Sequence, residues 1–93
     1  MRAESETSSK KFIDYLVKQI VSKPEEVFVE EEKNIGDYTS IKLKVSSEDM
    51  GLVIGKEGKT IRGIRSLARA KAIKEGIKVS LELIDPKVQN AKI

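Results

Sequence analysis

The sequence predicts an α+β domain of two layers, in which a three-stranded mixed sheet is covered on one face by three helices. The apolar periodicity changes along the chain and gives the element order α-β-β-α-α-β. A tight turn joins the first two predicted strands, which favours an antiparallel hairpin. The last strand follows two helices, and a crossover of that length favours a position parallel to the second strand.

The first predicted helix spans Lys10 to Lys23. Pro24 ends it, because the residue before a proline is pushed out of the helical region. Burial of its apolar stripe contributes on the order of 10 kcal/mol before ordering entropy is subtracted. We expect the stripe in the core, with packing against a partner's helix as the alternative. The polar residues 1–9 are predicted to form a flexible tail. The stripe consists of Phe12, Ile13, Leu16, Val17, Ile20 and Val21.

Two strands are predicted next, from Glu25 to Lys33 and from Tyr38 to Val45, joined by turn residues at 34–37. The second segment is the clearer strand, because apolar and polar side chains alternate along it as expected of a strand with one buried face. In the first segment Val27 and Val29 are predicted to face one way and Phe28 and Glu30 the other. In the second, Ile41, Leu43 and Val45 alternate with Lys42 and Lys44 in a half-buried pattern.

A short helix is predicted from about Ser47 to Ile54. We expect Ser46 to cap this helix, with Asp49 three residues further on in the manner of a capping box. Gly51 is a weak helix former, and close packing is the expected reason for its presence inside the helix.

The last helix is predicted from about Lys59 to Glu75, with Gly76 in the position that commonly ends a helix. A strand from Lys78 to Ile84 follows it. The domain is therefore expected to span residues 10–86, with 87–93 as a C-terminal tail. The helix is predicted to bury Ile61, Ile64, Leu67, Ala68 and Ala72, and the strand to turn Val79, Leu81 and Leu83 inward.

Composition argues against several classes of function. The chain has 93 residues, 18 Lys and Arg against 15 Asp and Glu, and a net charge of +3. It contains no cysteine and no histidine, so disulfides, thiolate metal sites and His-based catalytic sites are excluded. We expect no enzyme activity, metal, cofactor or small-molecule substrate. Apolar runs are too short for a membrane span and no secretion leader is visible, so a soluble, cytoplasmic protein with no membrane partner is expected.

Gly55 and Gly58 enclose two charged residues, Lys56 and Glu57, between an apolar run and a basic helix. Glycine lets another backbone come close and permits positive φ. The N-terminus of the following helix presents free N–H groups and a positive dipole end. This pattern predicts a loop that grips a nucleic-acid backbone. The alternative is a surface turn between two helices.

Charge is unevenly distributed along the chain. Residues 50–78 hold eight cations and two anions, net +6, whereas residues 25–49 hold three cations and eight anions, net −5. Arg62, Arg65 and Arg69 recur at spacings of three and four, so they form a stripe that begins beside the glycine loop. This distribution suits a polyanion laid along one side of the domain, and the acidic segment is expected to repel it from the other side.

A rival motif lies in the same segment. Gly58-Lys59-Thr60 matches the end of a nucleotide-binding P-loop, Gly-x-x-x-x-Gly-Lys-Thr. That motif needs glycine at position 53, where this chain has Val53. The chain is also short for a nucleotide-hydrolysing α/β domain, so nucleotide hydrolysis is not expected.

The segment from Val53 to Ile61, Val-Ile-Gly-Lys-Glu-Gly-Lys-Thr-Ile, resembles the core of a KH domain. The element order resembles the bacterial type II arrangement, and length and layout resemble the stand-alone KH proteins of the KhpA/YlqC family. The resemblance covers about Lys10 to Asp85. It implies that about four unpaired nucleotides lie in a narrow groove. The RNA-binding residues would then be Ile54, Gly55, Lys56, Glu57, Gly58, Lys59, Thr60, Ile61, Arg62, Ile64, Arg65 and Arg69.

The resemblance also implies roles for these residues. Gly55 and Gly58 would let the sugar-phosphate chain approach, and Lys56 would face phosphate. The N–H groups near Lys59 and Thr60 would face it too.

An apolar groove for the bases is implied as well. Ile54, Ile61 and Ile64 would form its floor, and Leu81 or its strand neighbours would form the other wall. The alternative is that these aliphatic side chains belong to the ordinary core.

Glu57 departs from the KH pattern, in which basic or neutral residues are common at this position. Near a phosphate its carboxylate lowers affinity by about 1 kcal/mol, unless it points outward or accepts a hydrogen bond from a base or ribose. None of the four aromatic residues is near the loop in the sequence. Ring stacking is therefore not expected to be the main force of RNA binding. We expect weak sequence selectivity as a result.

The sequence is compatible with two functions. The first is a single-stranded RNA-binding protein that acts as a post-transcriptional regulator or RNA chaperone. The alternative is a KH-shaped protein-interaction module that acts mainly through a partner protein. The resemblance implies a homodimer, or a heterodimer with a larger Jag-type KH protein.

Overall fold

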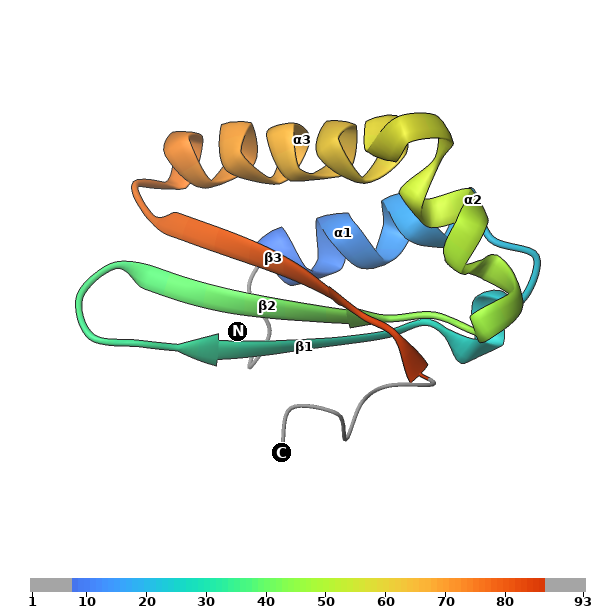
Figure 1. Ribbon diagram of the computed structural model, residues 1–93. Helices are drawn as coiled ribbons and strands as arrows, with labels where there is room; N and C mark the ends of the chain where they lie inside the picture. Colours follow the sequence, from blue (N-terminus) through green and yellow to red (C-terminus); the bar gives the residue numbers. More distant parts are fainter. Residues whose placement is uncertain (1–7, 87–93) are drawn as a thin grey trace.

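The computed structural model describes residues 8–86. Its helices are α1 (Ser8–Lys18), α2 (Met50–Ile54) and α3 (Lys59–Glu75), and its strands are β1 (Phe28–Lys33), β2 (Tyr38–Lys44) and β3 (Lys78–Ile84) (Figure 1). Single-turn 3-10 helices occupy Pro24–Glu26, Ser47–Asp49 and Lys56–Gly58. The predicted order α-β-β-α-α-β is confirmed, and α3 and β3 have the predicted bounds. Of the predicted tails, 1–9 and 87–93, residues 1–7 and 87–93 lie outside the described residues, whereas residues 8 and 9 belong to α1.

The three strands form one sheet in the order β1-β2-β3. β1 and β2 are antiparallel, with Glu30 opposite Lys42, and β2 and β3 are parallel, with Ile41 beside Leu81. Both pairings were predicted from the turn and the crossover. β1 and β3 are the two edges of the sheet, and β1 carries glutamates at the three successive positions 30–32.

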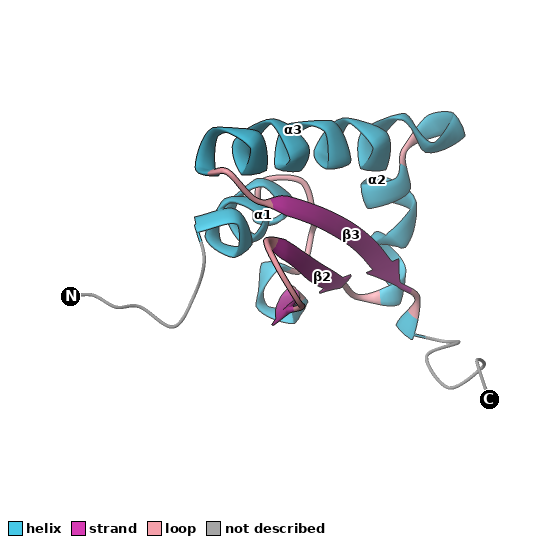
Figure 2. Ribbon diagram, turned by 90° about the vertical axis from the view of Figure 1, so that its left-hand side faces the viewer, coloured by secondary structure: helices cyan, strands magenta, loops and turns pink. Residues whose placement is uncertain are grey.

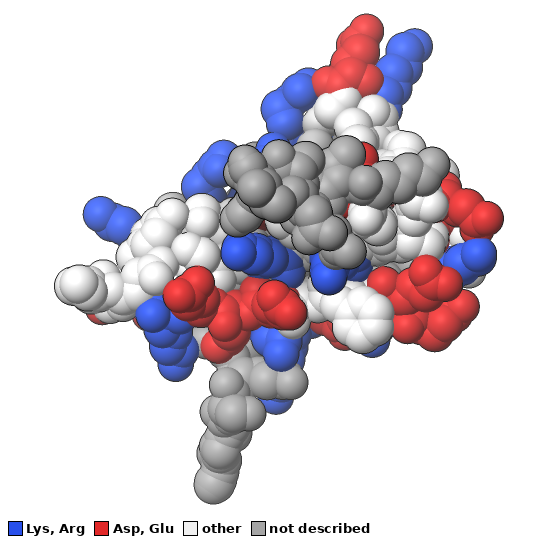
Figure 3. Space-filling view, turned by 60° about the horizontal axis from the view of Figure 1, so that its bottom comes forward, with Lys and Arg blue, Asp and Glu red and all other residues white. Residues whose placement is uncertain are grey.

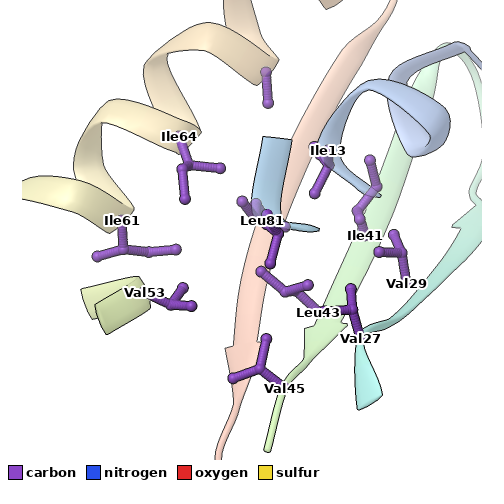
Figure 4. Close-up of a cluster of buried hydrophobic side chains, with 12 residues drawn as sticks. Ile13, Val27, Val29, Ile41, Leu43, Val45, Val53, Ile61, Ile64 and Leu81 are labelled. Carbon is purple, nitrogen blue, oxygen red and sulfur yellow. The ribbon is translucent and has the colours of Figure 1, made fainter. Parts of the chain in front are cut away.

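The helices lie on one side of the sheet, which confirms the two-layer α+β prediction (Figures 1 and 2). α3 runs along β3 and contacts α1, whereas α2 lies at the end of the sheet and packs against α3. Apolar side chains from both layers converge between them (Figure 4). The buried core consists of Ile13, Val17, Val27, Val29, Ile41, Leu43, Val45, Val53, Ile61, Ile64, Ala68 and Leu81.

The predicted bounds of the first helix were wrong at both ends. α1 begins at Ser8, and Ser9 is fully buried. The helix ends at Lys18 rather than Lys23, and its last turn tightens as the N–H of Ile20 donates to the Val17 carbonyl at 2.9 Å. Pro24 starts a separate 3-10 turn. The helix ends early because residues 22 and 23 are held by a carboxylate from a distant part of the chain.

That carboxylate belongs to Asp49, which is 1% exposed. It accepts hydrogen bonds from the Ser22 and Lys23 backbone N–H groups, both at 3.0 Å, and from the Ser22 hydroxyl at 2.7 Å. The Ser46 hydroxyl donates a fourth at 3.1 Å. The Ser22 backbone bond, with the others, lowers the pKa of Asp49 to about 2 against the opposing effect of burial.

The predicted capping box is therefore wrong. Ser46 makes no side-chain capping bond to the backbone, and its hydroxyl instead donates to Asp49. Asp49 faces the end of α1, so one side chain ties the segment after α1 to the start of α2. This connection positions the helix that leads into the glycine loop.

Two further packing predictions were wrong. Gly51 is exposed, and a Cβ atom at this position would meet nothing within 4 Å. Leu67 is 49% exposed, because α3 buries a narrow stripe at positions 61, 64, 68 and 72 and position 67 lies beside it. Within residues 8–86, no helix is both long enough and apolar enough to cross a membrane.

Candidate nucleic-acid interface

The Gly55–Gly58 loop stands at one end of the molecule between α2 and α3, far from the β1–β2 turn (Figure 1). The loop forms one 3-10 turn, closed by the Gly58 N–H donating to the Gly55 carbonyl at 3.1 Å. The Lys59 N–H donates to the Lys56 carbonyl. This amide, which the sequence placed among the groups facing phosphate, is therefore engaged within the loop.

Both glycines are required by the chain itself. Gly55 has φ 76° and ψ 173°, and its Cβ would lie only 2.8 Å from the Thr60 backbone nitrogen. Gly58 has φ 76° and ψ 13°, and its Cβ would lie 3.0 Å from Nη1 of Arg62. Side chains are disfavoured in both conformations. The fold itself thus requires residues without side chains at both positions, and both glycines are half-buried.

Glu57 is the one non-glycine residue with positive φ among the described residues, at φ 56° and ψ 26°. Its side chain is exposed. Its backbone carbonyl accepts a hydrogen bond from Nη1 of Arg62 at 2.8 Å. The Glu57 carboxylate is therefore accessible to solvent, and its effect on phosphate binding stays a prediction.

The predicted arginine stripe divides into different environments. Arg62 is exposed but bound to the loop carbonyl, as described above. Arg65 is half-buried, and its Nε donates to the Leu81 carbonyl at 3.1 Å, which links α3 to β3. Arg69 is exposed. Lys56 and Lys59 are also exposed and make no side-chain hydrogen bond or ion pair within residues 8–86.

The predicted apolar groove residues are mostly core. Ile61, Ile64 and Leu81 are 7%, 4% and 7% exposed, and the first two point from α3 toward β3 (Figure 4). Ile54 is 37% exposed at the end of α2. Ile61 and Ile64 therefore belong to the hydrophobic core, which is the alternative that the sequence left open. The contact of any of these residues with RNA stays a prediction.

Charge on the other side of the molecule is mixed. In the part of the sheet face that Figure 3 shows, acidic side chains gather in groups and basic side chains lie beside them. A cavity of about 430 Å³ lies at the turn end of the sheet, lined by Lys33, Gly36, Asp37, Tyr38, Thr39, Glu75 and Ile77. None of these belongs to the predicted RNA-binding set, so the glycine loop is not part of this cavity.

Two solved structures of the protein Era share this fold. Era from Aquifex aeolicus bound to GDP.AlF4- matches 89% of this chain with a TM-score of 0.65 and 18% identity, over 31% of the Era chain. Era in complex with MgGDPNP and nucleotides 1506–1542 of 16S ribosomal RNA matches 90% of this chain with a TM-score of 0.59 and 18% identity, over 33% of the Era chain. This chain spans about a third of the Era chains, and the likeness is one of fold alone.

Sequence comparison reaches further. The RNA-binding protein KhpA of Chlamydia caviae is 43% identical over 79 residues, which cover 84% of this chain and 99% of the relative. KhpA of Clostridium perfringens is 46% identical over 76 residues, 81% of this chain and 99% of the relative. The family model described as KhpA/KhpB, KH domain, matches residues 10–83. The chain therefore belongs to the KhpA/KhpB family of KH-domain proteins.

Proposed function

We propose that this protein binds single-stranded RNA and grips about four unpaired nucleotides through the Gly55–Gly58 loop and the start of α3. The observation that supports it most is the loop itself. Two glycines with positive φ lie beside two exposed lysines that have no partner within residues 8–86. The KhpA relatives are named RNA-binding proteins, which supports the same function.

In this proposal Lys56 and Lys59 bind phosphates on either side of the loop, and Arg69 extends the cationic surface along α3. The half-exposed Ile54 is the apolar contact for a base. Neutralising about four phosphates of a single strand predicts a slope near −3 in a plot of log affinity against log salt concentration. A flat response would contradict backbone gripping.

The test replaces the two charged loop residues by aspartate, as Lys56→Asp together with Glu57→Asp. Both positions are exposed, and aspartate tolerates the left-handed backbone of residue 57, so the variant is expected to fold. Loss of a phosphate contact and added repulsion predict at least about tenfold weaker binding of a short single-stranded RNA. Lys33→Asp, the same charge reversal at the opposite end of the molecule, is the control and is expected to bind RNA normally. Unchanged affinity of the folded loop variant would overturn the proposal.

The proposed cellular role is that of a post-transcriptional regulator or RNA chaperone in the cytoplasm. A short clamp with no aromatic stacking partner gives weak sequence selectivity and suits many transcripts. Crosslinking in cells followed by sequencing of the bound RNA tests this role. Recovery of many unrelated transcripts with unpaired segments supports it, and recovery of no RNA contradicts it.

A second candidate is a protein-interaction module, either a homodimer or a heterodimer with a larger Jag-type KH protein. The observation in its favour is exposed apolar surface on the helices, where Leu52, Leu67 and Ile73 are 50%, 49% and 77% exposed. Leu67→Lys is expected to leave the monomer folded and to abolish self-association measured by analytical ultracentrifugation. A wild-type chain that sediments as a monomer at all concentrations contradicts the homodimer.

A further inference from the structure

The side chain of Arg62 folds back from α3 onto the glycine loop. Gly58 is the residue that precedes the first helical residue of α3, so the carbonyl of Glu57 lies outside the regular hydrogen-bond pattern of the helix. Nη1 of Arg62 donates to this carbonyl at 2.8 Å. The contact thus supplies a partner to a main-chain acceptor that the helix itself does not use.

The carbonyl belongs to the one strained residue of the loop. Glu57 has a left-handed backbone with φ 56° and ψ 26°, a conformation that is unfavourable for residues with a side chain. Such a conformation persists where the surrounding structure holds it. Within the described residues, Arg62 is the side chain that bonds to this peptide group.

Gly58 makes the contact possible. A Cβ atom at Gly58 would lie 3.0 Å from Nη1 of Arg62, so the guanidinium rests directly over the bare Cα. The strained residue, the glycine that follows it and the arginine therefore form one unit. Because its guanidinium bonds to the Glu57 carbonyl, the Arg62 side chain is restricted to few rotamers before any RNA binds.

We propose that Arg62 is a positioning residue for the glycine loop, holding the Glu57 peptide in its left-handed conformation so that the loop and Lys56 are preorganised for an RNA strand. Preorganisation strengthens binding because the loop then loses less conformational freedom in the complex. The inference deepens the proposed function and rests on it for the RNA readout. It differs from the earlier expectation that Arg62 is simply a phosphate ligand of the arginine stripe.

The test is a double-mutant cycle on Arg62→Met and Glu57→Asn. Methionine keeps the apolar stem but removes the donors, and asparagine accepts the left-handed conformation more readily than glutamate. The probe is a fluorescein-labelled single-stranded RNA of about twelve mixed nucleotides, roughly three times the length that a KH groove holds. Arg62→Met is expected to weaken binding about tenfold with Glu57 present, the size of one hydrogen bond to a charged group. In the Glu57→Asn background the same change is expected to weaken binding about twofold or less.

Arg69→Met is the matched control, because Arg69 is exposed on the same helix and makes no contact with the loop. Its loss of affinity is expected to be equal in both backgrounds. If Arg62→Met also weakens binding equally in both backgrounds, Arg62 binds phosphate directly and the proposal is wrong. No loss in either background contradicts it as well.

A second readout uses the protein without RNA. The Gly58 N–H donates to the Gly55 carbonyl at 3.1 Å inside the loop, so its hydrogen exchange reports whether the turn stays closed. Arg62→Met is expected to speed this exchange severalfold, and the change is expected to vanish with Glu57→Asn. Unchanged exchange contradicts positioning by Arg62. Normal exchange effects without any RNA binding contradict the proposed function and leave the positioning role supported.

Discussion

Gly51 and Gly55 lie one helical turn apart, and alanine is predicted to have opposite effects at the two positions. Gly55 has φ 76° and ψ 173°, a region that residues with a side chain avoid at a cost of about 1–3 kcal/mol. The added Cβ would also lie 2.8 Å from the Thr60 backbone nitrogen, and such overpacking costs about 1–3 kcal/mol. Gly51 is exposed in α2 with nothing within 4 Å of a Cβ, so alanine there removes only the helix penalty of glycine, about 0.5–1 kcal/mol.

Thermal unfolding followed by circular dichroism measures both effects. For a domain of this size about 1 kcal/mol corresponds to roughly 4–8 °C in Tm. Gly55→Ala, which carries both costs, is therefore expected to lower Tm by at least about 8 °C, and Gly51→Ala to raise it by about 2–8 °C. Gly63→Ala, at a second exposed helical glycine with open space around it, is expected to behave like Gly51→Ala. Equal Tm values for Gly51→Ala and Gly55→Ala would refute the claim that the fold itself requires a bare residue in the loop.

Three further predictions concern the residues that hold the elements together. Because the folded pKa of Asp49 is about 2, below its ordinary value of 3.8, its contribution to stability is present above about pH 4 and is lost as pH falls through about 2. Urea unfolding of Asp49→Asn should thus show lower stability at neutral pH and a weaker acid dependence in that window; an unchanged acid profile would contradict the assignment. Arg65→Met removes the donor to the Leu81 carbonyl and is expected to destabilise the fold by about 1 kcal/mol in urea unfolding, whereas an unchanged midpoint would show that the link contributes nothing. Gly76→Ala places a side chain at φ 74° and is expected to lower stability by about 1 kcal/mol, and equal midpoints would contradict this.

The element order was predictable because local patterns decide it. Alternation indicated which face of β2 is buried, and Gly76, whose positive φ ends α3, marked the last helical boundary. The end of α1 was not predictable from its own residues. It depends on Asp49, which binds Ser22 from 27 positions away in the chain. The same long-range bond explains why the capping box predicted at 46–49 does not form. The Asp49 carboxylate accepts hydrogen bonds from the backbone N–H groups of Ser22 and Lys23 instead.

The candidate site was predictable in place but not in detail. The two glycines, the lysines and the helix after them indicated where the loop lies. No sequence pattern indicates that Glu57 adopts positive φ, since this conformation is rare for glutamate. Arg62 bonds to the Glu57 carbonyl and Arg65 to the Leu81 carbonyl, and neither contact can be read from the sequence. The spacing of the arginines alone therefore suggested one uniform stripe. Leu67 was misplaced because one residue of helical rotation separates the buried stripe from solvent.

The glutamates of β1 have a consequence for how the protein behaves in concentrated solution. An edge strand offers unpaired backbone groups to which the edge of another molecule can add. Two copies meeting there would bring the acidic positions 30–32 of each together, and the side chain of Glu31 is turned toward the helical face in the manner of a blocking charge. Screening shortens the reach of such repulsion to about 3 Å at 1 M salt. Clear stocks at low ionic strength, and slow formation of sheet-rich precipitate at high ionic strength, are the expected result.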